Sequence, residues 1–217
     1  MLGLQLQKRV VVMAIATFLA LVGLAMHAYP GGTSWNASAP GHDFWLNYLC
    51  DLARPTALNG VPNPTGSTLA QAAMLALAVG LLPWWSLVAR LTPGRPRAGR
   101  VIRTLGTIAA IGVVFVVALP GDRFGRAHGV ACVSAGLPGL VAGVLAVVSL
   151  FRDSSAPRIV RWVGAATLLA SLACFGLYLP DVLSLGSAIT TVAVLERISV
   201  VLLLLWMLVC CAACRTS

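Results

Sequence analysis

The chain has 217 residues, of which 59% are hydrophobic and only 10% are charged, and its formal net charge is +9. Ordinary soluble domains are about 45–50% apolar, so this composition excludes a soluble globular protein and predicts an integral membrane protein. The net positive charge does not indicate a nucleic acid partner, because the basic residues flank apolar segments instead of forming a patch.

Six long apolar segments follow one another along the chain, each close to the roughly 20 residues that a helix needs to cross a bilayer. They cover residues 10–29, 67–91, 101–120, 127–151, 159–180 and 187–213. The sequence therefore predicts an all-α fold, in which residues 1–217 form a single domain of six transmembrane helices.

The basic residues predict the topology. The connections expected on one side of the membrane carry only Arg54, Arg123 and Arg126. The two ends of the chain and the alternate connections carry Lys8, Arg9, Arg90, Arg95, Arg97, Arg100, Arg103, Arg152, Arg158, Arg161 and Arg215. By the positive-inside rule, we expect a protein of the cell membrane with both termini in the cytoplasm.

The outer connection, residues 30–66, is much longer than the usual loop of about 4–6 residues, which is typical of a functional segment. Aromatic and apolar residues recur in it at helical spacing, with Asp43, Asn47 and Asp51 on the opposite side. We therefore expect a short amphipathic helix at the outer membrane surface, where Trp45 and Tyr48 contact lipid head groups or a partner protein. Its polar side would face water or the mouth of the bundle.

A second polar group follows the third apolar segment, in the stretch LPGDRFGRAHG. We expect Asp51, Asp122 and His128 to converge as catalytic residues and metal ligands, with His42 as a further ligand. His128 falls in the first turn of the fourth helix, where the helix dipole favours a neutral imidazole. Such oxygen and nitrogen donors suit Zn²⁺ or a harder divalent ion. Either of two arginines in the same stretch would hold the phosphate of a head group, Arg123 or Arg126.

Glu196 and Arg197 lie well inside the last apolar segment. A charge at such depth costs about 2.5–3.5 kcal/mol, so both side chains are expected to be buried in the bundle and paired. Adjacent helical residues point about 100° apart, and we therefore expect each of the two to find a partner on another helix. The candidate partners are Gln71, Asp122, Arg126, His128 and Ser134.

Five of the six cysteines, including Cys132, fall in or at the end of apolar segments, and Cys50 alone belongs to the outer connection. This distribution argues against a framework of disulfides. We interpret the cysteines at the end of the last segment as small apolar side chains that fill space.

Three short motifs carry a resemblance to a known family. They are Leu49-Cys50-Asp51-Leu52-Ala53, Leu119-Pro120-Gly121-Asp122 followed by His128, and the pair Glu196-Arg197. With these motifs the chain resembles the bacterial six-span membrane family catalogued as domain of unknown function 998, a distant look-alike of the damage-regulated autophagy modulator group. The first motif corresponds to an Ile-Ser-Asp-Leu-Gly element of that family. Asp51 and Leu52 match this element, whereas Cys50 and Ala53 stand where the family has serine and glycine. The resemblance implies an architecture and a set of residues, but no reaction.

Three functions fit these features. The first is an outward site that handles a lipid head group and, in its catalytic form, hydrolyses it with a metal ion. The second is a non-catalytic accessory subunit or assembly factor of a larger membrane complex, whose aromatic loop contacts other subunits. The third is a small transporter, since buried charges and interrupted helices are common in carriers. The sequence does not decide whether the protein is an enzyme.

Overall fold

The computed structural model describes residues 3–153, 156–184 and 190–214. Six long helices dominate it, and all six are long and apolar enough to cross a membrane. They are α1 (Leu4–Ala28), α3 (Pro64–Arg90), α4 (Pro96–Ala118), α6 (Arg126–Arg152), α7 (Arg158–Ser184) and α8 (Thr190–Ala213). Two short helices, α2 (Leu49–Leu52) and α5 (Gly121–Phe124), lie in the connections, and the described residues form no strand. The predicted all-α multi-pass bundle is confirmed.

Most of the helices begin a few residues before the apolar segments that predicted them. The helix α1 begins at Leu4 and so includes Lys8 and Arg9, and α3 begins at Pro64. Hydropathy marks only the part of a helix that suits the hydrocarbon core, whereas the hydrogen-bonded backbone continues into the polar interface. Proline at the first helical position is favourable because the N–H that it lacks would have had no partner there.

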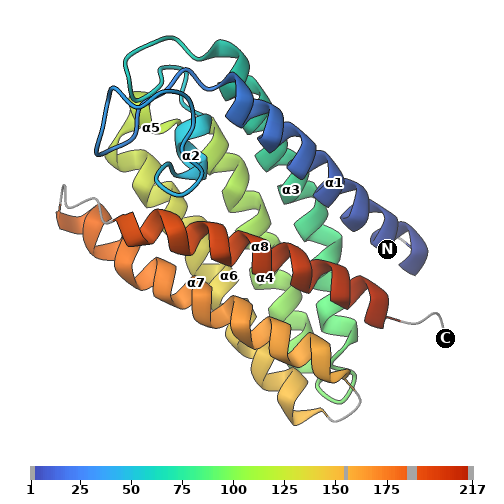
Figure 1. Ribbon diagram of the computed structural model, residues 1–217. Helices are drawn as coiled ribbons and strands as arrows, with labels where there is room; N and C mark the ends of the chain where they lie inside the picture. Colours follow the sequence, from blue (N-terminus) through green and yellow to red (C-terminus); the bar gives the residue numbers. More distant parts are fainter. Residues whose placement is uncertain (1–2, 154–155, 185–189, 215–217) are drawn as a thin grey trace.

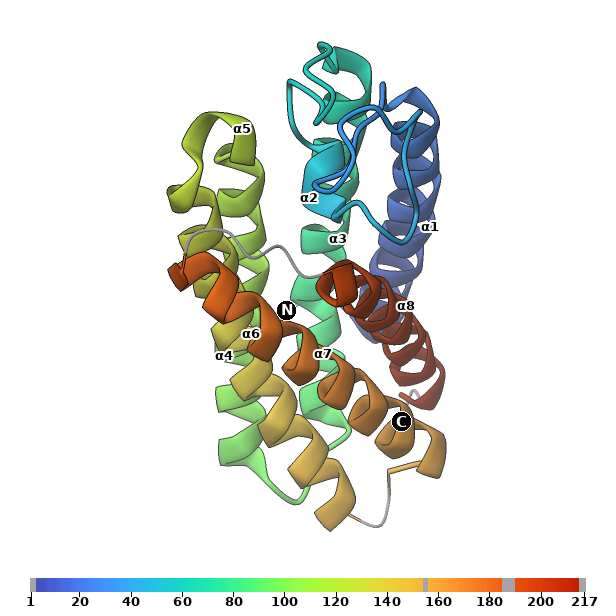
Figure 2. The same cartoon turned by 60° about the vertical axis from the view of Figure 1, so that its left-hand side comes forward.

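The long helices pack in chain order. The most extensive contacts join α1 to α3, α3 to α4, α4 to α6, α6 to α7 and α7 to α8, and α8 also touches α1 and α3. Figures 1 and 2 show that α2, α5 and the connection 29–63 lie at one end of the bundle, and Figure 1 shows the start of α1 and the end of α8 at the other. We call these the loop end and the terminal end.

Tight helix packing depends on glycines that face bulky side chains. A Cβ added at Gly106 on α4 would lie 2.1 Å from the ring of Trp85 on α3, and one added at Gly80 would lie 2.6 Å from the Cβ of Ala14. The buried Trp84 ring contacts both Trp85 and Trp206, with centroid distances of 4.4 and 5.1 Å. Any larger residue at Gly106 would have to push Trp85 out of its place.

The amphipathic helix expected in the loop is much shorter than predicted, because only Leu49–Leu52 is helical. The carboxylate of Asp43 accepts hydrogen bonds from the N–H groups of Trp45 and Leu46, at 2.9 and 3.0 Å. Side-chain bonds of this kind stabilise a turn in place of a helix. The polar side also faces inward, since Asn47 and Asp51 are 0% and 6% exposed, while Trp45 is 52% exposed. An interpretation of this side as a water-facing surface is therefore wrong for Asn47 and Asp51.

Candidate metal site at the loop end

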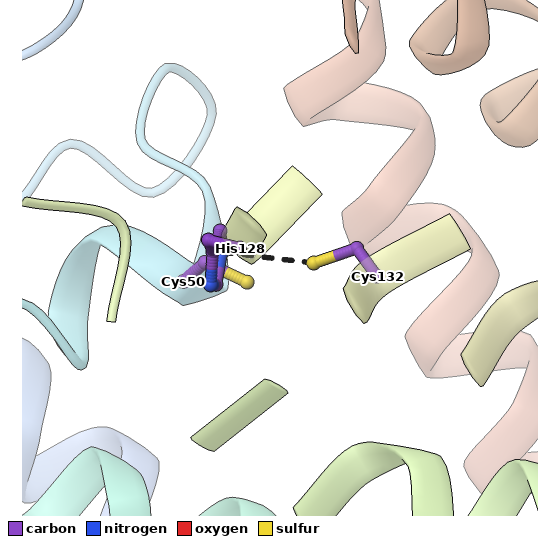
Figure 3. A group of neighbouring side chains, drawn as sticks. All are labelled: Cys50, His128 and Cys132. Carbon is purple, nitrogen blue, oxygen red and sulfur yellow. Dashed lines mark hydrogen bonds between the residues drawn. The ribbon is translucent and has the colours of Figure 1, made fainter. Parts of the chain in front are cut away.

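Cys50, His128 and Cys132 come together at the loop end, with their potential ligand atoms all within 4.8 Å of one another. Cys50 belongs to α2, whereas His128 and Cys132 are four residues apart on α6 and so lie on one face of that helix (Figure 3). Within the described part of the chain, this is the one group of three histidine, cysteine or acidic side chains that is compact enough to hold a metal ion.

The imidazole of His128 is oriented as in known metal sites. Its Nδ1 lies 2.7 Å from the carbonyl oxygen of Leu119, so an Nδ1–H donates there and Nε2 keeps its lone pair. Metal-binding histidines commonly donate their second ring nitrogen to a carbonyl in this way. The prediction that His128 lies in the first turn of its helix is confirmed.

The spacing of the ligand atoms fits zinc. Nε2 of His128 lies 3.6 Å from Sγ of Cys132 (Figure 3). Zinc binds sulfur at about 2.3 Å and nitrogen at about 2.0–2.1 Å, so at the tetrahedral angle two such ligands lie about 3.6 Å apart. Tyr178 on α7 also interacts with the Cys132 thiol. The pair on α6 therefore needs little movement to hold the ion.

Two carboxylates hold α2, and with it Cys50, in place. The N–H of Tyr48 donates to Asp51 Oδ2 at 2.8 Å, and the N–H of Leu49 donates to Glu196 Oε2 at 2.9 Å. Both N–H groups belong to the start of α2, where the helix itself supplies no acceptor. The Cys132 thiol, together with burial, raises the pKa of Cys50 well above its ordinary value, so metal binding would have to displace a proton from Cys50.

Arg197 ties the loop to α8. Its side chain is 4% exposed and donates to the carbonyl oxygens of Phe44 and Asn47, at 3.0 and 2.6 Å. It also forms an ion pair with the neighbouring Glu196 at 2.9 Å. The expected burial is confirmed for Arg197, whereas 23% of the Glu196 side chain is exposed. The two residues also pair directly with each other, which the expectation of separate partners on other helices did not include. Long side chains can curl toward the same point although their Cβ atoms diverge.

The other partners of the pair differ from those expected. Glu196 and Arg197 bind backbone groups of the loop, and the candidate Gln71 donates instead to the carbonyl oxygen of Ala53 at 3.2 Å. The backbone groups that the two charges bind are the N–H of Leu49 and the carbonyl oxygens of Phe44 and Asn47. The two charges therefore fasten the loop.

The predicted ligands Asp51, Asp122 and His42 do not belong to the compact group. Asp51 caps α2 and accepts a bond from Asn47 at 3.4 Å, while Asp122 Oδ2 accepts the N–H of Thr56 at 3.0 Å. The ring of His42 packs edge-on against Tyr29, with centroids 5.9 Å apart. Of the predicted ligands only His128 belongs to the compact group, and its other two members are Cys50 and Cys132.

Positive charge near the site comes from a different arginine than expected. A Cβ added at Gly121 would lie 3.5 Å from the ring of His128 and 3.8 Å from Nη1 of Arg54, so Arg54 and His128 approach the same point. Arg123 and Arg126 are exposed. Sequence reasoning missed Cys50, Cys132 and Arg54, although a histidine and a cysteine four residues apart on a helix are a usable signal for metal binding.

Searches with the sequence and with the structure found no protein-family model, curated protein or solved structure that matches this chain. The resemblance to the domain of unknown function 998 family therefore stays a prediction. The site is interpreted from its own geometry.

Proposed function

We propose that the protein binds a zinc ion with Cys50, His128 and Cys132 and acts on lipid head groups at the outer surface of the cell membrane. The observation that carries the proposal is the compact group of three ligands, in which the Leu119 carbonyl fixes the tautomer of His128. Two thiolates and one imidazole favour zinc over magnesium or calcium, which prefer oxygen ligands.

Three protein ligands are typical of a catalytic zinc ion, because the fourth position stays open for water. Zinc lowers the pKa of bound water to about 7 in such sites and so produces a nucleophile near neutral pH. Arg54, whose Nη1 approaches Gly121 as the ring of His128 does, supplies a positive charge that suits a phosphate ester. The proposed reaction is therefore hydrolysis of the head-group phosphodiester of a phospholipid. The oxygen of water would bond to phosphorus as one P–O ester bond breaks, and the leaving alcohol oxygen would take up a proton from that water.

The surroundings of the site support a substrate at the membrane surface. Three aromatic side chains of the loop are exposed: Trp35, Phe44 and Trp45. Exposed tryptophan rings are frequent at head-group level, where an apolar ring meets a polar edge. The distribution of arginines favours an orientation with the loop end outside and both termini in the cytoplasm.

The test uses proteoliposomes that contain phosphatidylethanolamine and phosphatidylglycerol, with release of water-soluble head groups measured by mass spectrometry. We expect release that a zinc chelator abolishes and zinc restores, and that Cys132→Ser and His128→Ala remove. Cys174→Ser is the matched control, because Cys174 is a thiol on α7 outside the ligand group. Absence of release from zinc-loaded protein would rule out hydrolysis of these lipids.

An accessory subunit is the second candidate, and the exposed Phe44 and Trp45 favour it because aromatic side chains are common at protein interfaces. Purification in mild detergent separates the two functions, since a subunit should retain stoichiometric partners. A transporter is less well supported, because the charges that would suggest one, Glu196 and Arg197, bind each other and the loop backbone.

A further inference from the structure

A second polar site lies at the terminal end of the bundle, away from the metal site. It is a pocket of about 350 Å³ between the end of α3 and the start of α4. Three arginines line it, Arg90, Arg100 and Arg103, together with the buried Gln7 of α1. Figure 1 shows that the connection between α3 and α4 lies at the opposite end from α2 and α5.

The positive charge of this pocket has little compensation from the chain. Among the described residues, neither Arg90 nor Arg100 forms an ion pair with a carboxylate, and the first turn of α4 contains no acidic residue. The residue that caps α4, Arg95, makes no capping bond with its side chain. Arg90 and Arg100 thus offer charged donors to the pocket, and no described carboxylate forms an ion pair with either of them.

The helix dipole increases this imbalance. The start of a helix carries a partial positive charge and unpaired N–H groups, so it favours anions and disfavours cations. Here Arg95 is the N-cap residue of α4, and Arg97 and Arg100 lie close to the start of the helix. The positive-inside rule accounts for arginines near this end of the bundle, but not for their place around a pocket at a helix start. A bound anion would compensate both the arginines and the dipole.

The floor of the pocket is built from small residues. A Cβ added at Gly99 would lie 3.3 Å from the carbonyl oxygen of Ala89 and 3.7 Å from Oγ1 of Thr92. Thr92 is itself buried and donates to Ala89 at 3.0 Å. Glycine at position 99 therefore lets α3 and α4 approach closely, and it places no side chain in the pocket.

We infer that this pocket binds a phosphate group, with Arg90 and Arg100 as its main charged contacts. Guanidinium groups bind phosphate oxygens through paired hydrogen bonds, and basic pockets between membrane helices suit the head groups of anionic lipids. The source of the phosphate is either a membrane lipid or a free phosphate ion. The inference does not depend on the proposed zinc chemistry.

The test compares two double variants that remove the same charge. Arg90→Gln with Arg100→Gln changes the pocket, and Arg95→Gln with Arg97→Gln changes exposed arginines that do not line it. Native mass spectrometry and thermal unfolding in neutral detergent would measure binding of phosphatidylglycerol, of phosphatidylcholine and of inorganic phosphate at constant ionic strength. The lipid and phosphate arms distinguish the two sources.

We expect phosphatidylglycerol or inorganic phosphate, but not phosphatidylcholine, to stabilise the parent and the control variant, and the pocket variant to lose at least tenfold in affinity. Gly99→Val gives a second test, because it fills the pocket and keeps every arginine. Equal losses in the two double variants would overturn the inference in favour of diffuse surface attraction. Lack of any response in the parent protein would overturn it as well.

Discussion

Replacement of Glu196 tests how α8 fastens the loop. In Glu196→Ala, Arg197 loses its ion-pair partner while 96% of its side chain stays out of contact with solvent, and the N–H of Leu49 loses its acceptor. Removal of one partner from a fully buried pair costs about 3–5 kcal/mol, and the 23% exposure of the Glu196 side chain lowers this cost. Arg197 keeps its two bonds to carbonyl oxygens, so we expect a loss near the lower end of that range. Glu196→Gln should cost about 1–3 kcal/mol, because its amide oxygen still accepts one bond.

The assay is unfolding in mild detergent, with zinc affinity as the second readout. Because Leu49 precedes Cys50, Glu196→Ala should bind zinc about 10–100-fold more weakly, as is typical when residues that support metal ligands are changed, and Glu196→Gln should lose less because its amide oxygen can still accept the Leu49 N–H. Val201→Ala is the control on the same helix, since Val201 is exposed on the bundle surface. Equal stability of both Glu196 variants and the parent would refute the argument, as would unchanged zinc affinity in a destabilised Glu196→Ala.

The remaining predictions concern packing, pH and metal binding. Gly106→Ala should destabilise the protein by about 1–3 kcal/mol in detergent unfolding, because Trp85 fills the space of its Cβ, whereas Gly23→Ala, which would meet no atom within 4 Å, should not. Burial and Arg197 lower the pKa of His42 to about 4, below the 6.5 of the unfolded chain. The unfolded state therefore binds more protons as the pH falls from 6.5 to 4, and stability should drop by about 1–2 kcal/mol after allowance for solvent screening. His42→Phe should flatten this drop, and a persistent drop would show that another group titrates. Cys132→Ser should weaken zinc binding at least tenfold in a chelator competition, and unchanged affinity would remove this thiol from the site.

The six helices and the position of His128 in the first turn of α6 could be predicted from hydropathy and charge, because these features depend on local sequence. The meeting of Cys50 with Cys132 could not be predicted in this way. It depends on where a non-helical loop folds back, and that is decided by bonds from Arg197 to loop carbonyls and from the Leu49 N–H to Glu196.

The predicted set of ligands differed from the compact group in the structure because a carboxylate has several uses that look alike in a sequence. Asp51 has the residue type of a metal ligand, but its oxygen satisfies the N–H of Tyr48 at the start of α2. The half-buried thiols of Cys50 and Cys132 had the opposite ambiguity. Cysteine packs as a small apolar residue, so such a thiol is recognised as a candidate ligand only when its neighbours in space are known.

X-ray absorption at the zinc edge of the zinc-loaded protein tests the central claim most directly. The proposed site predicts two sulfur ligands at about 2.3 Å, one imidazole nitrogen at about 2.0–2.1 Å and one further light atom. Cys132→Ser should reduce the sulfur shell to one ligand, and Cys174→Ser should leave it unchanged. A zinc ion that is bound without sulfur, or a protein that retains no zinc, would contradict the assignment of Cys50, His128 and Cys132.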